Sequence, residues 1–205
     1  RFGETGGSAV TDTSGTGITG TYFNSPSLNE PGLVEAASDG RSARLGETSY
    51  ALVDNDASWA VNTFTWTIVA KAAASAIADG AYIIAANEAG QNAGDIGIRF
   101  TSDGLGRLRW WGDSPGFSAI ESGSAVVEAD TPFTLTIRCD TTSMDVIVNG
   151  VLLGSLAHTV GMAGNTTSIQ YAYRSIGGDA YDITFDESWM YNSALSLSDI
   201  QALHE

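Results

Sequence analysis

Paired carboxylates on one strand are the residues whose spacing could support chemistry in this sequence, and Glu128 and Asp130 form the nearest such pair. Residues two apart on a β-strand project to the same face, and a retaining glycosidase needs two carboxylates roughly 5 Å apart. Pro132 follows almost at once and would interrupt a strand that held both acids. The pair therefore does not predict a catalytic site.

Other catalytic sets are equally poor in this sequence. Asp182, Asp186 and Glu187 cluster on a predicted strand, but the neighbouring Trp and Tyr residues indicate packing rather than a cleft. His158 and His204 are the two histidines, and neither has a partner at a useful spacing. The sequence also lacks a Gly-x-Ser-x-Gly motif, a phosphate-binding loop and zinc-ligand spacing. We therefore predict that the chain is not an enzyme.

Aromatic side chains beside polar ones indicate carbohydrate binding instead. A sugar stacks the C–H groups of one face on an aromatic ring, while its hydroxyls bond to Arg, Asp or Asn. The candidate carbohydrate-binding residues are Trp111, Arg109, Arg107, Asp113, Tyr171, Tyr173 and Arg174. The alternative is that Trp111 and the tyrosines only cover the second sheet, while the core holds Trp66, Trp110 and Trp189. Loops 113–118 and 175–179, rich in Gly, Ser and Asp, could equally hold the site.

The charge of the chain disfavours several partners. The sequence has 24 acidic and 9 basic residues, which gives a net charge of −15. Such a surface repels nucleic acid and anionic membranes, and it attracts divalent cations. The simpler interpretation is that the acidity only keeps the protein in solution.

Length and composition favour one domain spanning residues 1–205. Its 205 residues, 43% of them hydrophobic, suffice for a two-layer core, and no run approaches the roughly 20 apolar residues of a membrane span. The sequence begins at Arg1 without Met or a signal peptide, so we expect a piece of a longer protein. Cys139 is the single cysteine and alternates in phase with apolar neighbours, which predicts a buried thiol.

Alternating apolar residues predict an all-β fold. Strands are expected at 19–23, 43–45, 50–53, 64–71, 81–87, 95–100, 107–111, 144–148, 151–156, 168–173 and 182–191. Asn149-Gly150 is a strong hairpin signal between two of them. Residues 71–78 are interpreted as a strand end and a loop, despite their alanine content. Roughly ten to thirteen strands without alternating helices predict a two-sheet antiparallel β-sandwich of jelly-roll type.

One short helix is predicted at the C-terminal end. Ser196 can cap it, Asp199 completes a capping box, and Leu195 can pack on Ile200 as a hydrophobic staple. A helix of about two turns is unstable alone, so its apolar side chains are expected to dock on the sandwich. These side chains are Leu197, Ile200 and Leu203.

Both ends of the sequence carry motifs of a known fold. The stretch from Phe185 to Ser196 and the Gly-rich motifs between Glu4 and Leu33 resemble the closing strand with its helix and the opening segment, respectively, of laminin-G-like, concanavalin A-like jelly rolls of bacterial and phage proteins. Related glucanases carry Glu-x-Asp-x-x-Glu on one strand, whereas Phe133 stands at the last acidic position here. The resemblance therefore implies the fold without the catalytic set.

The same resemblance implies a structural calcium ion between the opening segment and the last strand. The ligands that it implies are Asp186, with Glu4 or Asp12 from the opening segment. Asp186 and Glu187 project to opposite faces, so one of them faces a packed layer, where a carboxylate must be neutralised. An arginine or backbone N–H groups would serve as well as a cation, and both alternatives stay open.

These observations give two hypotheses for function. The first is a non-catalytic carbohydrate-binding or adhesion module, extracellular, on a cell surface or on a virion, with a glycan or cell-surface polysaccharide as partner. The second is a structural domain of a spike, fibre or decoration protein that contacts other subunits of a particle. The single lysine, the high content of small residues and the resemblance to phage domains favour the second.

Overall fold

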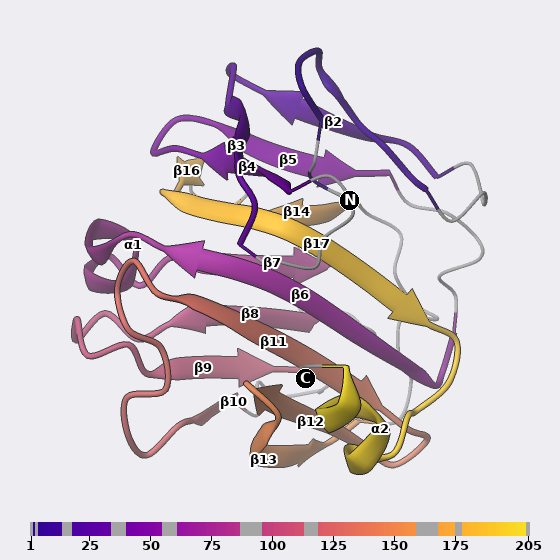
Figure 1. Ribbon diagram of the computed structural model, residues 1–205. Coiled ribbons are helices and arrows are strands. Elements are labelled where there is room, and N and C mark those ends of the chain that lie inside the picture. Colours follow the sequence, from indigo (N-terminus) through magenta and orange to yellow (C-terminus); the bar gives the residue numbers. More distant parts are fainter. Residues whose placement is uncertain are drawn as a thin grey trace.

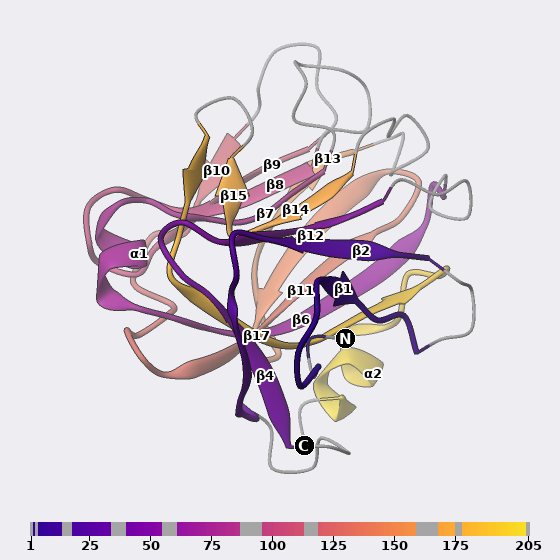
Figure 2. The same ribbon diagram turned by 90° about the horizontal axis from the view of Figure 1, so that it is seen from above.

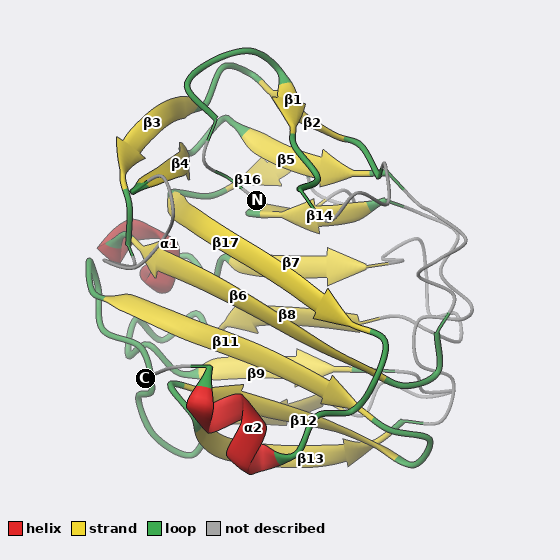
Figure 3. Ribbon diagram, turned by 45° about the vertical axis from the view of Figure 1, so that its right-hand side comes forward, coloured by secondary structure: helices red, strands yellow, loops and turns green. Residues whose placement is uncertain are grey.

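Two antiparallel sheets stacked face to face form the protein in the computed structural model (Figures 1 and 3). The structure describes residues 2, 4–13, 18–33, 40–54, 61–86, 96–112, 119–158, 168–174 and 178–203. The first sheet runs in the order β1 (Ala9–Val10), β2 (Gly20–Phe23), β5 (Tyr50–Val53), β14 (Ile169–Tyr171), β7 (Tyr82–Ala86), β8 (Ile96–Phe100), β9 (Leu108–Trp111) and β10 (Ala119–Glu121). The predicted jelly-roll β-sandwich is confirmed.

The second sheet has seven strands and faces the first (Figure 2). Its order is β13 (Val151–Ala157), β12 (Ser143–Val148), β11 (Pro132–Cys139), β6 (Phe64–Ala72), β17 (Ile183–Tyr191), β4 (Arg41–Leu45) and β3 (Ser27–Pro31). β15 (Tyr173–Arg174) and β16 (Asp179–Ala180) pair with each other and form a separate two-stranded sheet. The described residues thus form seventeen strands, more than expected, because several have only two or three residues.

The core lies between the sheets and is built by the alternation read from the sequence. In the β8–β9 hairpin, Ile98, Phe100 and Trp110 are fully buried, while Arg99 and Arg109 project to the outer face. Cys139 is buried in the same core, as predicted. Side chains that point inward from both layers therefore exclude water from the space between them.

The β12–β13 hairpin confirms the strongest turn signal. Asn149 and Gly150 adopt left-handed φ values of 49° and 75°, which fit a turn whose twist matches the flanking strands. A register shift between Val146 and Ile147 places a bulge in this hairpin. The pairing resumes beyond it and ends at Ser143 opposite Ala157.

The interpretation of residues 71–78 as a strand end and a loop is wrong in its second half. β6 ends at Ala72, and a helix, α1 (Ala74–Ala78), follows before β7. Ala76 and Ile77 of this helix are buried, so the high helix propensity of alanine and the burial of one face outweigh the short distance to the next strand. Gly80, with φ of 70°, then reverses the chain.

The closing helix, α2 (Leu197–Ala202), begins as predicted. The Ser196 hydroxyl accepts from the Asp199 N–H at 3.1 Å, and the Asp199 carboxylate accepts from the Ser196 N–H at 3.3 Å. The helix lies on the outer side of the second sheet (Figures 2 and 3), where Gln201 Nε2 donates to the Gly150 carbonyl at 3.2 Å. Ile200 is buried, but Leu203 is 45% exposed. The prediction that all three apolar side chains dock on the sandwich is therefore wrong for Leu203.

Neither helix in the described part of the chain has the length or apolar character needed to cross a membrane.

Candidate functional site

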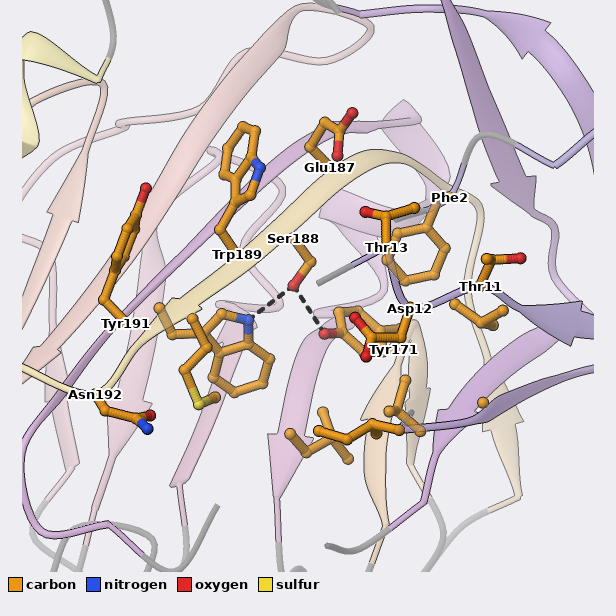
Figure 4. Close-up of a pocket in the computed structure, with 17 residues that line it drawn as sticks. Phe2, Thr11, Asp12, Thr13, Tyr171, Glu187, Ser188, Trp189, Tyr191 and Asn192 are labelled. Carbon is orange, nitrogen blue, oxygen red and sulfur yellow. Dashed lines mark hydrogen bonds between the residues drawn. The ribbon is translucent and has the colours of Figure 1, made fainter. Parts of the chain in front are cut away.

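A pocket of about 480 Å³ lies beside the second half of β17, with which β4 does not pair (Figure 4). β17 pairs with β4 only from Ile183 to Phe185, although its pairing with β6 continues to Tyr191. The opening segment approaches this edge, since the Phe2 N–H donates to the Asp186 carbonyl at 3.0 Å. The pocket is lined by the second half of β17, by residues 10–13 and by buried side chains of both sheets.

One hydroxyl ties the floor of this pocket across the two sheets. Trp66 Nε1 on β6 donates to Ser188 Oγ at 2.9 Å, and Tyr171 Oη on β14 lies 2.9 Å from the same oxygen (Figure 4). The Phe2 ring meets Tyr171 edge-on at a centroid distance of 4.9 Å. Burial raises the pKa of the Tyr171 hydroxyl, which stays protonated at neutral pH. The floor is therefore aromatic, and its polar groups are hydrogen-bonded to one another across the two sheets.

The mouth of the pocket carries two exposed aromatic rings, which project from the side of β17 opposite to Ser188, and two carboxylates, of which Glu187 is 8% exposed. Trp189 and Tyr191 are 40% and 37% exposed, and they project from the same side of β17 as Glu187 (Figure 4). Asp12 reaches the pocket from the opening segment, and Asn192 adds an amide. An aromatic surface beside hydrogen-bond acceptors has the chemistry needed to hold a sugar ring, stacked on one face and bonded through its hydroxyls.

A bulge in β17 decides which side chains reach this mouth. The register with β6 shifts between Phe185 and Ser188, so two residues, Asp186 and Glu187, occupy the irregular part. Beyond the shift, Ser188 faces inward and Trp189 outward. The expectation that Trp189 belongs to the core is therefore wrong, because its side chain is 40% exposed.

The seven predicted carbohydrate-binding residues are not gathered at one place. Arg107, Arg109 and Trp111 lie on the outer face of the first sheet, as their alternation predicted. Tyr171 is buried on the inner face and is 4% exposed. Arg174 is the last residue of β15, and its side chain, like all of Asp113, lies outside the described part.

On the outer face of the first sheet, the charged side chains pair with one another. Arg107 Nε donates to Asp103 at 2.6 Å, and Arg109 lies 3.7 Å from the Glu121 carboxylate. Trp111 lies directly over Gly97, because a Cβ built on that glycine would be 2.0 Å from Trp111 Cζ2. These contacts are those of a packed outer surface.

Tyrosines add two further stacks to that face. Tyr173 stacks on Tyr50 at a centroid distance of 3.9 Å, and Tyr50 stacks on Phe23 at 4.8 Å. Tyr82 meets the Trp111 ring edge-on at 5.5 Å. Whether Trp111 or Tyr173 binds a ligand stays a prediction, as does each residue of the predicted set.

The three predicted calcium ligands lie along the opening segment and β17. Glu4 accepts from the Tyr22 hydroxyl at 2.6 Å and from the Thr11 N–H at 2.5 Å. Asp186 is fully buried, and its Oδ2 accepts from the Leu33 N–H at 2.7 Å, so a backbone donor contributes to its neutralisation. Asp12 lines the pocket. No group of three or more His, Cys, Asp or Glu residues suited to a metal occurs in the described ranges, and the calcium site stays a prediction.

Sequence reasoning missed Trp189, Tyr191 and Glu187 as site residues, although a signal was present. Small or apolar side chains alternate with large aromatic ones in Ser188-Trp189-Met190-Tyr191, which predicts one strand face that carries Trp189 and Tyr191. What the alternation does not reveal is that β4 pairs with β17 only from Ile183 to Phe185.

Solved structures of several binding domains share this fold. The receptor-binding domain of botulinum neurotoxin mosaic serotype C/D superposes with a TM-score of 0.72 at 15% identity, covering 99% of this chain and 49% of that one. Domain 4 of AbnA, a GH43 extracellular arabinanase from Geobacillus stearothermophilus solved with arabinotriose, gives a TM-score of 0.68 at 16% identity, covering 91% and 88%.

A structure of botulinum neurotoxin type C, a toxin whose cell entry depends on interaction with two ganglioside molecules, superposes with a TM-score of 0.67 at 13% identity. The match covers 96% of this chain and 50% of that one. This chain thus spans about half the length of the toxin chains. A search of curated proteins gave no match. The family model described as the concanavalin A-like lectin/glucanases superfamily matches residues 45–201, most of the chain. The protein belongs to the concanavalin A-like lectin/glucanases superfamily.

Proposed function

We propose that the protein is a non-catalytic carbohydrate-binding module whose ligand occupies the pocket beside β17. The observation that carries this proposal is the exposure of Trp189 and Tyr191 at the mouth of a pocket whose aromatic floor is hydrogen-bonded across the two sheets. Large aromatic rings are costly to leave in water, and exposed rings at a pocket are typical of ligand sites.

The charges of the pocket favour a neutral saccharide. Its ionisable lining residues in the described part are Asp12, Glu187 and two tyrosines, with no Lys or Arg among them. Carboxylates accept hydrogen bonds from sugar hydroxyls, but they repel the carboxylates and sulfates of acidic glycans. The net charge of −15 adds to that repulsion at long range.

The structural neighbours support a binding role by analogy of fold. The arabinanase domain was solved with arabinotriose, which is a neutral oligosaccharide. Cell entry of the type C toxin depends on interaction with two ganglioside molecules. At 13–16% identity the likeness lies in the fold, so the choice of ligand rests on the pocket itself.

The non-catalytic part of the proposal rests on where the structure places the acidic residues that were considered as catalytic carboxylates. Asp130 lies in a turn with φ of 57°, before β11 begins at Pro132, so Glu128 and Asp130 do not share a strand. Asp182 is paired with Arg44 at 2.8 Å, and Asp186 is fully buried. None of these acids has the accessible pairing that glycoside cleavage needs.

We also place the module outside the cell, on a secreted protein, a cell surface or a particle. The extracellular arabinanase domain supports this location, and the acidic surface suits it. A cell-surface or virion location stays a prediction.

The test compares Trp189→Ala with Trp111→Ala, two partly exposed tryptophans on different sheets. Affinity electrophoresis and calorimetry on neutral arabino-, gluco- and galacto-polysaccharides should show binding that Trp189→Ala weakens at least about tenfold and Trp111→Ala leaves unchanged. Sialylated and uronic acid polymers should bind more weakly than neutral ones. No binding to any polysaccharide, or equal loss in both variants, would refute the site. Release of new reducing ends would refute the non-catalytic part.

A further inference from the structure

The outermost strands of the two sheets are protected to very different degrees. β1 has two residues and β10 has three, and β10 ends with Glu121 beside Arg109. β3 contains Glu30 and Pro31, and its register with β4 is irregular. Short length, charge and proline are the devices by which natural sheets prevent their edges from pairing with other strands.

β13 lacks these three devices, and its only irregularity is the register shift opposite Val146 and Ile147. It has seven residues, Val-Leu-Leu-Gly-Ser-Leu-Ala, with no charge and no proline. Val151 is 63% exposed, the largest exposure of a large apolar side chain in the described part, and Leu152 is 42% exposed. α2 reaches the same corner through Gln201, and its Leu203 is also exposed. The edge therefore combines backbone groups that pair with no further strand of the described ranges with apolar side chains.

The charge of the protein indicates which partner fits this edge. Two copies, each at −15, repel one another over most of their surface. An uncharged strand lets two copies meet without placing like charges opposite each other. An antiparallel pair of identical strands is also self-complementary, because a two-fold axis places residue i of one copy opposite residue j of the other, and residue j of the first opposite residue i of the second.

We propose that β13 pairs antiparallel with β13 of a second copy, so that the second sheets of two molecules join into one continuous sheet. Alternate N–H and C=O groups that point away from β12 would then bond across the two-fold axis, and Leu152 would be covered by the partner. Three strands, β12, β11 and β6, separate β13 from β17. The pocket beside β17 therefore stays open, and the dimer presents two such pockets.

Sedimentation of the 205-residue chain over a concentration series tests this pairing. The wild type should reach twice the 21.3 kDa of one chain. Leu152→Lys should raise the dissociation constant of the dimer at least about tenfold, because each copy then carries a lysine in place of an apolar side chain on the edge that pairs. Leu105→Lys is the matched control, since Leu105 is 61% exposed in the turn between β8 and β9 and the change of charge is the same.

Circular dichroism verifies that each variant is folded. If Leu152→Lys does not fold, Val151→Lys takes its place in the experiment. A wild type that stays monomeric throughout the series would overturn the proposal. A dimer that persists in a folded β13 variant would do the same, as would equal dissociation of the Leu105→Lys control. Because carbohydrate binding is measured separately, either proposal can fail while the other stands.

Discussion

Replacing Ser188 with alanine should destabilise the protein more than the loss of one small polar atom suggests. The Ser188 hydroxyl accepts from Trp66 Nε1 and bonds to the Tyr171 hydroxyl, each at 2.9 Å. Trp66 and Tyr171 are 1% and 4% exposed, so Ser188→Ala leaves two buried polar groups without this partner. Two hydrogen bonds at about 1 kcal/mol each, with a further desolvation cost for the stranded groups, give about 2–4 kcal/mol. Water that enters from the pocket would bring the value to the lower end of that range.

A double-mutant cycle separates this bridge from a general effect of packing. Tyr171→Phe alone should cost about 1 kcal/mol, because Trp66 keeps its acceptor. The double variant Ser188→Ala/Tyr171→Phe should cost less than the sum of the single changes by at least about 0.5 kcal/mol, since the second change removes a group that the first had stranded.

Urea unfolding followed by circular dichroism supplies all four free energies of unfolding. Ser124→Ala, at an exposed serine, is the matched control and should stay within about 0.5 kcal/mol of the wild type. If Ser188→Ala also stays within that margin, or if the single changes add, the bridge does not hold the two sheets together and the reasoning fails.

Three further predictions follow from local contacts. Burial raises the pKa of Tyr22, helped by Glu4, and burial also raises that of Tyr171, so the folded state holds both protons more tightly than the unfolded chain does. The contribution of these two protonated hydroxyls to the free energy of unfolding is complete below the ordinary pKa of 10.0 and is lost as the pH rises above it. Urea midpoints that stay constant as the pH rises above 10.0 would contradict this. Gly97→Ala should destabilise by about 1–3 kcal/mol and alter tryptophan fluorescence, because the new methyl group overlaps the Trp111 ring; an unchanged spectrum and melting temperature would contradict it. Ser196→Ala should cost about 1 kcal/mol through loss of the α2 cap, and an unchanged free energy of unfolding would show that the cap is dispensable.

Local patterns in the sequence were sufficient for most of the fold. The alternation in 96–100 and 108–111, the Asn149-Gly150 turn and the Ser196 capping box each concern residues within a few positions of one another. Their physics is local, because side-chain direction, turn twist and helix capping depend on neighbouring residues. The same information identified the superfamily resemblance that the match to residues 45–201 confirms.

The tertiary structure decided where a ligand site can lie. The sequence singled out Trp111, but it could not show that this ring covers Gly97, which is fourteen positions away along the chain. It assigned Trp189 to the core, whereas the early end of β4 and the bulge in β17 leave that ring at the mouth of a pocket. Exposure of a side chain depends on which strands pair beside it and where they stop, and those contacts join residues more than a hundred positions apart. Periodicity along one strand fixes the face on which a side chain lies, while only the assembled sheets determine whether that face is covered.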